Sequence, residues 1–230
     1  VGVAVSVVVC VFLGVTIEFL AYRPLRKAPS LAVLITAIGV SYLLQSLALL
    51  VFKSEPKAFP TIIEIPSLTF GGVVVDGMTL LTLAVTAVIM ISLSLFINKT
   101  KLGKAMRAVS EDKDAAELMG ISVNRTITMT FAIGSALAAV ASVFYGATYT
   151  YIKPTTGSMP GIKAFTAAVF GGIGSIPGAM IGGVLLGVIE ILGKAYVSTE
   201  LGDALVFAVL ILVLLVKPTG LLGKPVREKV

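Results

Sequence analysis

Long apolar runs without a single charge are the feature that most constrains the fold of this chain. Four of them are uncharged throughout: Leu31–Phe52, Met78–Ile97, Thr126–Ile152 and Ala204–Val216. A helix needs about 20 apolar residues to cross a bilayer, and runs of this length are rare in soluble domains. Charged residues make up 13% of the chain, about half the share typical of soluble proteins. We therefore predict an all-α polytopic membrane protein, with residues 1–230 forming one transmembrane domain.

The basic residues gather in three segments of the chain. Residues 21–30 contain three Lys and Arg, residues 98–125 contain six and the tail from Lys217 contains four, out of 18 in all. By the positive-inside rule these segments face the cytoplasm, which predicts a multi-pass membrane protein. Loop orientation explains the net charge of +6, so we expect no nucleic-acid partner. The chain has no His and one Cys, Cys10, so we expect no metal site and no internal disulfide.

The apolar blocks predict six membrane segments, at residues 1–20, 31–52, 78–97, 126–152, 162–192 and 201–216. The first four alternate across the membrane around a cytoplasmic loop at 98–125. Because the tail is also cytoplasmic, block 162–192 must return to the side from which it entered. We predict that it is broken and re-entrant. The sequence starts inside an apolar run without Met, so we expect an N-terminally incomplete chain.

The break is expected in the stretch FGGIGSIPGAMIGG, residues 170–183. Glycine inside a helix costs about 0.5–1 kcal/mol relative to alanine, so a run of glycines predicts a turn. The turn would comprise Gly171, Gly172, Gly174 and Ser175, and Pro177 suits the first turn of the returning helix. Irregular backbone at membrane depth is tolerated where it is enclosed by protein or lines a water-filled cavity. For the turn we favour a translocation pathway.

Close helix packing is the other interpretation of the small residues. Gly178 and Gly182 in the returning helix are four residues apart, and span four has Gly134, Ala138 and Ser142 at the same spacing. Such small-xxx-small faces let membrane helices approach closely. For the returning helix both interpretations stay open. We expect span four to press its small-residue face against that helix.

The cytoplasmic loop reads NKTKLGKAMRAVSEDKDAAELMGISVNR. It predicts one short helix over Leu102–Val109 and a second one capped by Ser110 and ended by Gly120. The loop could lie on lipid headgroups as an amphipathic segment. The four acidic residues within Glu111–Glu117 argue against an anionic bilayer surface and favour docking into another protein.

Two acids lie inside predicted spans. An intramembrane acid is a functional candidate by default, but Glu190 has Lys194 four residues later, and we favour an ion pair between them. Glu18 lies at the cytoplasmic end of the first span, where we expect it to pair with Arg23. The external segment 59–77 has β-branched runs that predict a small hairpin or loop.

The segment DAAELMG resembles the EAA-x3-G motif of ABC importer permeases, with Asp at the leading position. In that class the motif forms a coupling helix that docks into the ATPase subunit. The resemblance assigns ATPase coupling to five residues of this chain: Asp114, Ala115, Ala116, Glu117 and Gly120.

Four longer stretches resemble permeases of branched-chain amino acid ABC importers: AYRPLRKAPSLAVLITAIGVSYLLQ, KLGKAMRAVSEDKDAAELMGI, KAFTAAVFGGIGSIPGAMIGG and LVLLVKPTGLLG. The resemblance implies uptake of leucine, isoleucine and valine into the cytoplasm. It also implies separate ABC ATPase subunits, a second permease subunit and an extracytoplasmic substrate-binding protein. The chain has no G-x4-G-K-[ST] phosphate loop, so we expect no cofactor on this subunit and ATP on its partners.

Two other functions, an ATP-independent transporter or channel and an intramembrane protease, are the alternatives. A secondary transporter or channel working without ATP would have the same hydropathy and the same broken helix, but it gives no reason for the acidic cytoplasmic loop. An intramembrane protease would need activated or paired reactive groups within the spans. Ser175 has no His in the chain to activate it, so we do not expect an enzyme.

Overall fold

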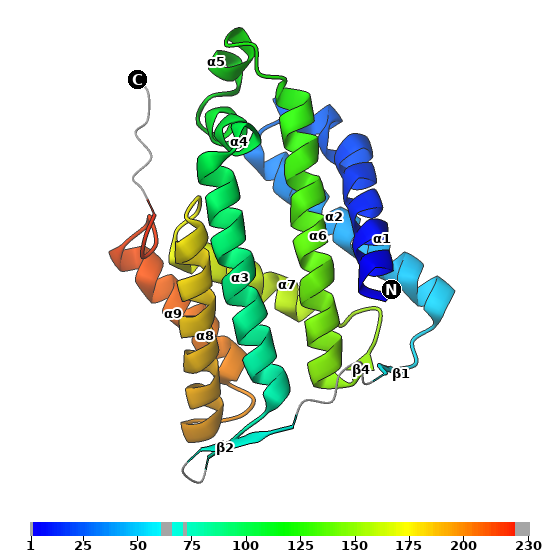
Figure 1. Ribbon diagram of the computed structural model, residues 1–230, viewed down its shortest axis with the longest axis vertical. Helices are drawn as coiled ribbons and strands as arrows, with labels where there is room; N and C mark the ends of the chain where they lie inside the picture. The colour runs from blue at the N-terminus through cyan, green and yellow to red at the C-terminus, as the bar shows by residue number, and fades with distance from the viewer. Residues whose placement is uncertain (1, 61–65, 71–72, 224–230) are drawn as a thin grey trace. The chain divides into compact units, whose positions relative to one another are not determined.

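The computed structural model describes residues 2–60, 66–70 and 73–223 (Figure 1). Five of the described helices are long and apolar enough to cross a membrane, which confirms the predicted all-α polytopic class. The chain forms two compact units. Unit 1 contains residues 1–89 and 95–156, and unit 2 contains residues 90–94 and 157–230.

Unit 1 contains four of the membrane-length helices. The first, α1 (Gly2–Ile17), continues into a π-helical turn, η1 (Glu18–Tyr22), and a 3-10 turn, η2 (Pro24–Lys27). The others are α2 (Ser30–Phe52), α3 (Gly77–Lys99) and α6 (Val123–Tyr149). Helix α1 packs along α6 (Figure 1). Helix α6 ends at Tyr149 and not at Ile152, because Thr150 adopts a left-handed conformation and the chain then enters a strand.

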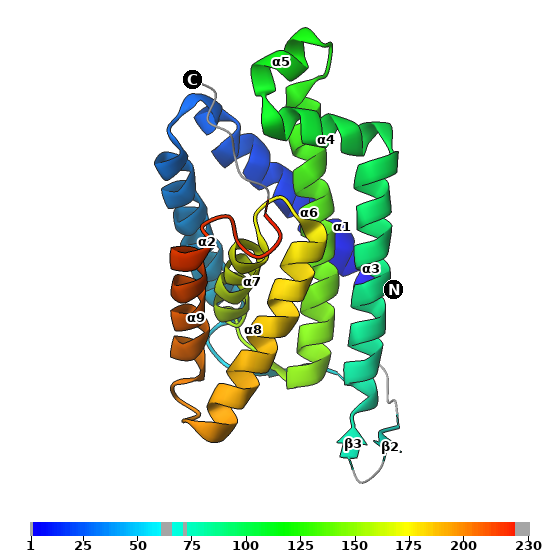
Figure 2. The ribbon, with the colours of Figure 1, turned by 90° about the vertical axis from the view of Figure 1, so that its left-hand side faces the viewer.

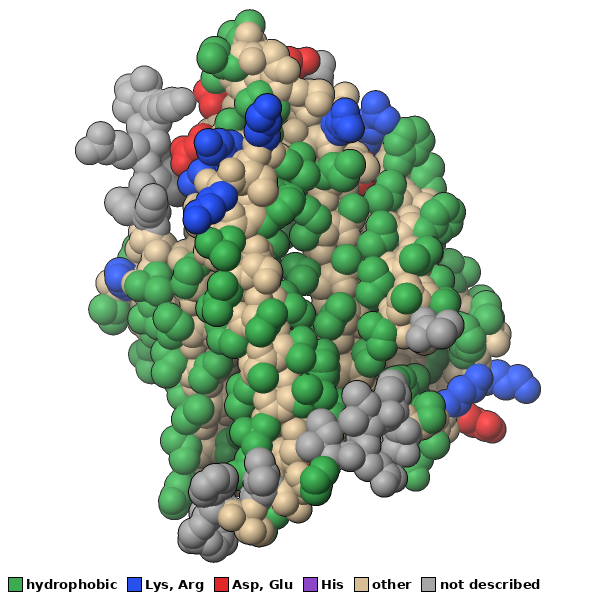
Figure 3. All heavy atoms as spheres, viewed as in Figure 1, with side chains coloured by type: hydrophobic (Ala, Val, Ile, Leu, Met, Phe, Trp, Pro, Cys, Tyr) green, Lys and Arg blue, Asp and Glu red, His purple; other side chains and the backbone are tan. Residues whose placement is uncertain are grey.

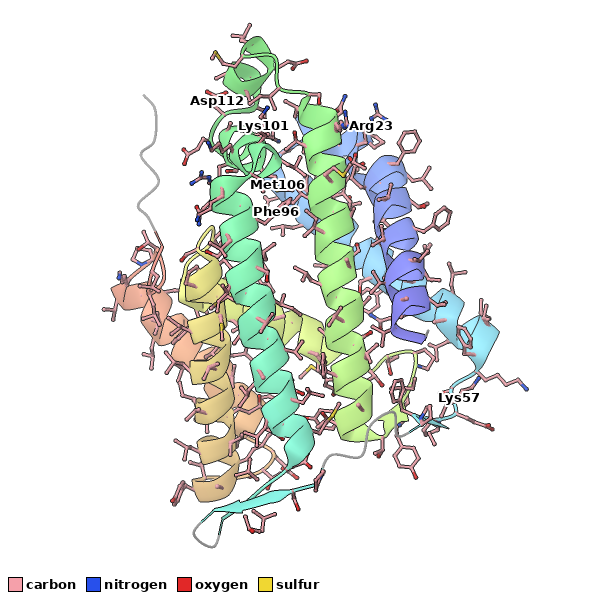
Figure 4. All side chains as sticks on the ribbon, in the orientation of Figure 1. Arg23, Lys57, Phe96, Lys101, Met106 and Asp112 are labelled. Atoms are coloured by element: carbon pink, nitrogen blue, oxygen red, sulfur yellow. The ribbon has the colours of Figure 1, made fainter. Side chains whose placement is uncertain are left out.

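Short antiparallel strands connect the helices of unit 1. Strand β1 (Lys57–Ala58) pairs with β4 (Tyr151–Ile152). Strands β2 (Leu68–Phe70) and β3 (Val73–Val75) pair with each other, which confirms a hairpin within segment 59–77. Residues 61–65 and 71–72 of that segment lie outside the described residues. Lys57 lies at the opposite end of unit 1 from Arg23, Lys101 and Asp112 (Figure 4), as expected for external and cytoplasmic ends.

The predicted cytoplasmic loop forms two helices, α4 (Lys101–Glu111) and α5 (Lys113–Leu118). Figure 2 shows α4 lying across the ends of α3 and α6. The predicted helix start at Ser110 is wrong, because α4 continues through this residue and its hydroxyl donates to the Arg107 carbonyl (2.8 Å). Asp112 caps α5 by accepting from the backbone N–H of Asp114 and Ala115 at 3.1 and 3.0 Å. Gly120 ends the loop helix with φ +81°, as predicted.

Unit 2 is built on a helical hairpin of α7 (Ser158–Gly171) and α8 (Ile176–Tyr196), followed by α9 (Gly202–Val216). Block 162–192 is therefore interrupted at residues 172–175. Helix α8 has 21 residues and reaches about 31 Å, enough to cross a bilayer, whereas the 14 residues of α7 reach about 21 Å. The buried core of the unit is formed by Ala167, Phe170, Leu186 and Val206. Re-entry of this block into the membrane stays a prediction.

Candidate functional site

The α7–α8 hairpin is held by direct contact between glycine backbones. A Cβ added at Gly171 would overlap the carbonyl oxygen of Gly178, and one at Gly178 would overlap the carbonyl oxygen of Gly171. A Cβ at Gly182 would lie 2.5 Å from the Ala167 carbonyl oxygen. Gly178 and Gly182 thus lie on the face of α8 that meets α7. At these positions any side chain would push the two helices apart.

The turn between the two helices has one packed side and one open side. Ser175 caps α8 by accepting from the Gly178 N–H at 3.2 Å, and Pro177 lies in the first turn, as the sequence predicted. The described residues supply no hydrogen-bond partner for the N–H groups of Ile173 and Gly174. Ile173 is 74% exposed, and a Cβ at Gly174 would meet no atom within 4 Å. This side of the turn is therefore open to a ligand or another subunit.

Residues 217–223, here called the C-terminal strap, close the other side of the turn. The N–H groups of Leu221 and Leu222 donate to the carbonyl oxygens of Phe170 and Gly171, both at 2.9 Å. Gly172 lies against the strap with φ +106°, and a Cβ there would overlap the backbone nitrogen of Gly223. The strap thus supplies the partners that the last carbonyls of α7 lack. No pattern in residues 217–223 predicted this role.

The tip of the loop at residues 98–125 presents apolar side chains on the surface of unit 1. Leu118 and Met119 are 90% and 82% exposed, whereas Ala116 is buried at 4%. Asp114, Ala115, Glu117 and Gly120 are also exposed. Hydrophobic side chains lie beside acidic ones at this end of unit 1 in Figure 3. Of the five predicted coupling residues, Ala116 is buried and the other four are exposed.

The predicted small-residue face of span four does not meet α1. Gly134, Ala138 and Ser142 are exposed on unit 1. The neighbouring face packs instead: Ala139 is fully buried, and a Cβ added at Gly14 of α1 would overlap the Ser135 side chain. The expected contact of Gly134, Ala138 and Ser142 with the returning helix stays a prediction.

A cluster of charged side chains joins the three helices of unit 2. Lys163 of α7 lies 2.8 Å from Glu190 Oε1 of α8 and 2.7 Å from Asp203 Oδ1 of α9. Glu190 also pairs with Lys194, which confirms the predicted ion pair. The sequence gives no sign that Lys163 and Asp203 belong to this cluster, because only the fold brings their distant positions in the chain to Glu190. The cluster balances two cations with two anions, so its contacts are those of a structural tie.

The predicted Glu18–Arg23 pair is wrong. Glu18 pairs with Arg26, the residue that η2 turns back toward it. The guanidinium of Arg23 lies over the ring of Phe19, 5.0 Å from its centroid. A cation can be stabilised by an aromatic face as well as by a carboxylate, and the sequence alone did not separate the two arginines.

A pocket of about 120 Å³ in unit 1 is lined by apolar side chains of α1, α3 and α6: Val3, Met78, Leu81, Val140, Val143, Phe144 and Ala147. An amino acid carries an ammonium and a carboxylate, which need polar partners once they leave water. These lining residues offer neither charge a side-chain partner. The pocket is therefore a poor site for a whole amino acid.

Comparison with known proteins decides between a transport subunit and the other functions. Residues 1–214 match the family model described as the permease component of branched-chain amino acid transport systems. The chain belongs to this family. It is 49% identical to the high-affinity branched-chain amino acid transport system permease protein BraD of Pseudomonas aeruginosa, over 99% of this chain and 75% of that protein. It is 46% identical to the LivH permease protein of Escherichia coli K12, over 100% of this chain and 76% of that protein.

A more distant likeness covers less of the permease. The fructose import permease protein FrcC of Rhizobium meliloti is 31% identical over 45% of this chain and 30% of its own length. No solved structure gave a significant match. Family membership makes this permease a component of a transport system, and not an enzyme. With its membrane-length helices, it is a multi-pass protein of the bacterial inner membrane.

Proposed function

We propose that this permease carries leucine, isoleucine and valine into the cytoplasm as a membrane subunit of an ATP-driven importer. The named relatives that cover the whole chain are permeases of high-affinity branched-chain amino acid transport systems. The observation that carries the proposal is the tip of α5, where Leu118 and Met119 are largely exposed next to the acids Asp114 and Glu117.

The tip of α5 supports docking to an ATPase subunit. Two large apolar side chains facing cytoplasmic water favour burial in a partner, since full burial of each contributes about 1.5–3 kcal/mol. Ala116 and the Asp112 cap hold α5 in place, so these side chains are presented on a fixed helix. We infer that ATP is hydrolysed by ABC ATPase subunits, and that a second permease subunit and an extracytoplasmic binding protein complete the importer.

We place the translocation pathway on the open side of the α7–α8 turn, at Gly174, Ser175 and Pro177. Gly171 and Gly172 pack against α8 and the C-terminal strap, and in this pathway they act as the fixed support of the turn. The N–H groups of Ile173 and Gly174, which find no partner among the described residues, lie just before the N-terminus of α8. A helix N-terminus stabilises a carboxylate, so this turn suits the carboxylate of an amino acid.

The test is uptake of radiolabelled leucine into proteoliposomes that contain the full-length permease, its partner permease, the ATPases and the binding protein. Uptake should require both internal ATP and the binding protein. Uptake without either would overturn the proposal in favour of a transporter that works alone. Hydrolysis of ATP stimulated by the binding protein, without leucine flux, would keep the importer and overturn the substrate.

A charged residue at the tip of α5 tests the docking step. Leu118→Asp should abolish copurification of the ATPase subunits and uptake, because it puts a charge into the proposed contact. Ser110→Asp is the matched control, since it adds the same charge to an exposed position of α4 away from the tip. Full uptake by a well-expressed Leu118→Asp variant would contradict docking through this tip.

Gly120→Val tests whether α5 must keep its position. Valine at φ +81° is strained by roughly 1–2 kcal/mol, so the end of the loop helix should shift. Uptake should fall while the permease still inserts in the membrane. Normal uptake by this variant would show that the position of α5 is not transmitted.

A further inference from the structure

A buried carboxylate lies where the end of α1 meets the start of α6. Glu18 is 1% exposed and is the first residue of the π-helical turn η1. Burying an unpaired carboxylate costs far more than a folded protein can tolerate, so such a group requires partners with matching charge or hydrogen bonds. The partners of Glu18 therefore show which parts of unit 1 it holds together.

Glu18 has partners on two different segments. Arg26 of η2 forms an ion pair with Oε1, and the Thr128 hydroxyl of α6 donates to Oε2 at 2.8 Å. Arg26 also donates to the Asn124 side-chain oxygen. Asn124 and Thr128 are one helical turn apart and lie on one face of α6. The side chains of Glu18 and Arg26 thus join this face of α6 to the end of α1.

This joint lies directly behind the cytoplasmic loop. Helix α6 begins at Val123, and Asn124 is its second residue. The chain between α5 and α6 is short and tied down, since the Ile121 N–H donates to the Ala116 carbonyl at 3.0 Å. A displacement of α5 therefore reaches the contact of Asn124 with Arg26 before it reaches that of Thr128 with Glu18.

On the other side of the joint, α1 changes its helical form. From Glu18 the helix widens into a π turn, closed by the hydrogen bond from the Arg23 N–H to the Glu18 carbonyl (2.8 Å). Single π turns within α-helices are rare and are frequent at functional sites. One turn earlier, Gly14 lies tightly against Ser135 of α6. The end of α1 thus has a fixed contact at Gly14 and a differently wound segment at the ion pair.

We propose that Glu18, with Arg26 and Thr128, is the positioning element that passes movement of the cytoplasmic loop to α1 during transport. This inference rests on the proposed function, because it requires a loop that is moved by ATPase subunits. Neither Glu18 nor Arg26 contacts substrate in this role. They act through Asn124 and Thr128 at the start of α6, and α1 responds as a whole span.

The test uses the complete reconstituted importer and measures leucine uptake and ATP hydrolysis in the same vesicles. Glu18→Gln keeps the size of the side chain but removes the charge that Arg26 faces. We expect uptake per ATP hydrolysed to fall roughly 2- to 30-fold, the range found for residues that couple distant sites. Thr128→Val keeps the ion pair and removes one hydrogen bond, so it should give a smaller fall in the same direction. The Thr128→Val variant also tests the proposal if the Glu18→Gln variant does not fold.

Two matched variants serve as controls. Arg23→Gln changes an arginine of the same segment whose guanidinium lies over Phe19. Thr130→Val removes a hydroxyl of α6 whose hydrogen bond goes to the Thr126 carbonyl of its own helix. Both should keep the wild-type ratio of uptake to hydrolysis. A purely structural role predicts a lower thermal stability of Glu18→Gln and Thr128→Val with that ratio unchanged, and this result would overturn the inference.

The loop variants separate this inference from the proposed function. If Leu118→Asp stops uptake while Glu18→Gln and Thr128→Val keep the wild-type ratio, the ATPase docks at α5 and the Glu18 joint is not used. If Leu118→Asp has no effect on uptake, docking through the tip of α5 is contradicted. Without a loop that the ATPase moves, the Glu18 joint has no movement to pass to α1.

Discussion

The helix pairs α1–α6 and α7–α8 both pack closely at a glycine, but different contacts hold each pair together. Each pair has glycine at its closest approach and an ionic tie near one end. In the first pair Gly14 meets a side chain, that of Ser135, and the tie is the buried carboxylate of Glu18. In the second pair Gly171 and Gly178 meet each other's backbone. The ion pair of this second pair, Lys163 with Glu190, is partly exposed, with Lys163 at 27%. The α1–α6 pair therefore relies on electrostatics, and the hairpin relies on backbone contact.

The largest effect is expected at the buried tie. Glu18→Ala should lower the free energy of unfolding by about 3 kcal/mol, because it leaves the Arg26 guanidinium, which is 17% exposed, without its counter-ion. The measurement is denaturant-induced unfolding of the purified permease in one detergent. Glu200→Ala, at an exposed carboxylate, should change little. A loss below about 1 kcal/mol would show that the first pair does not depend on its ion pair.

A smaller loss is expected at the backbone contact of the hairpin. Gly171→Ala should destabilise by about 1–3 kcal/mol, since the new methyl group meets a carbonyl that cannot rotate away. Gly183→Ala is the control on α8, where a Cβ would make an ordinary contact with Ala167 at 3.8 Å. Thermal unfolding of both variants checks this. Equal melting temperatures for the two would refute the claim that the hairpin requires bare backbone at Gly171.

The matching glycine of the first pair should be more tolerant. Gly14→Ala should cost about 1–2 kcal/mol, toward the low end for overpacking, because the Ser135 hydroxyl can rotate away while its Cβ, 2.7 Å from the added methyl group, still forces a small shift. The double variant with Ser135→Gly should recover that loss, since it removes the group that the methyl meets. Unfolding of the single and double variants gives the comparison. A loss at Gly14 as large as that at Gly171, without recovery in the double variant, would erase the difference between the pairs.

The smallest effect is expected at the open tie of unit 2. Lys163→Met should change stability by less than about 1 kcal/mol, because partly exposed ion pairs contribute little. Glu190 keeps Lys194 in this variant, and Asp203 is 39% exposed. Denaturant-induced unfolding of this variant and of the wild type measures the change in stability. A loss above about 2 kcal/mol would mean that this cluster behaves as a buried network.

The local features were predictable because local chemistry decides them. Uncharged runs locate the spans, Ser175 and Pro177 mark the start of α8, and Gly120 supplies the conformation that ends the loop helix. The cap of α5 was misplaced because Ser110 and Asp112 are both good caps. Asp112 is the cap in the structure because Val109 is buried and extends α4 past Ser110.

The long-range contacts were not predictable, because they depend on which segments the fold brings together. Arg23 and Arg26 are equally basic, and only the turn at η2 directs Arg26 to Glu18. The stretch KPTGLLG predicts a turn by its Pro and Gly, but nothing in it names Phe170 and Gly171 as partners. The same holds for Lys163, which meets Asp203 only after α9 has packed on the hairpin.

The C-terminal strap has a consequence for how the permease is made. Phe170 and Gly171 leave the ribosome well before Leu221 and Leu222, whose N–H groups their carbonyls accept. An unpaired buried backbone carbonyl costs free energy comparable to a lost hydrogen bond, so the hairpin stays incomplete until Leu221 and Leu222 have been synthesised. A chain that stops after α9 would therefore contain α7, α8 and α9 but an open hairpin.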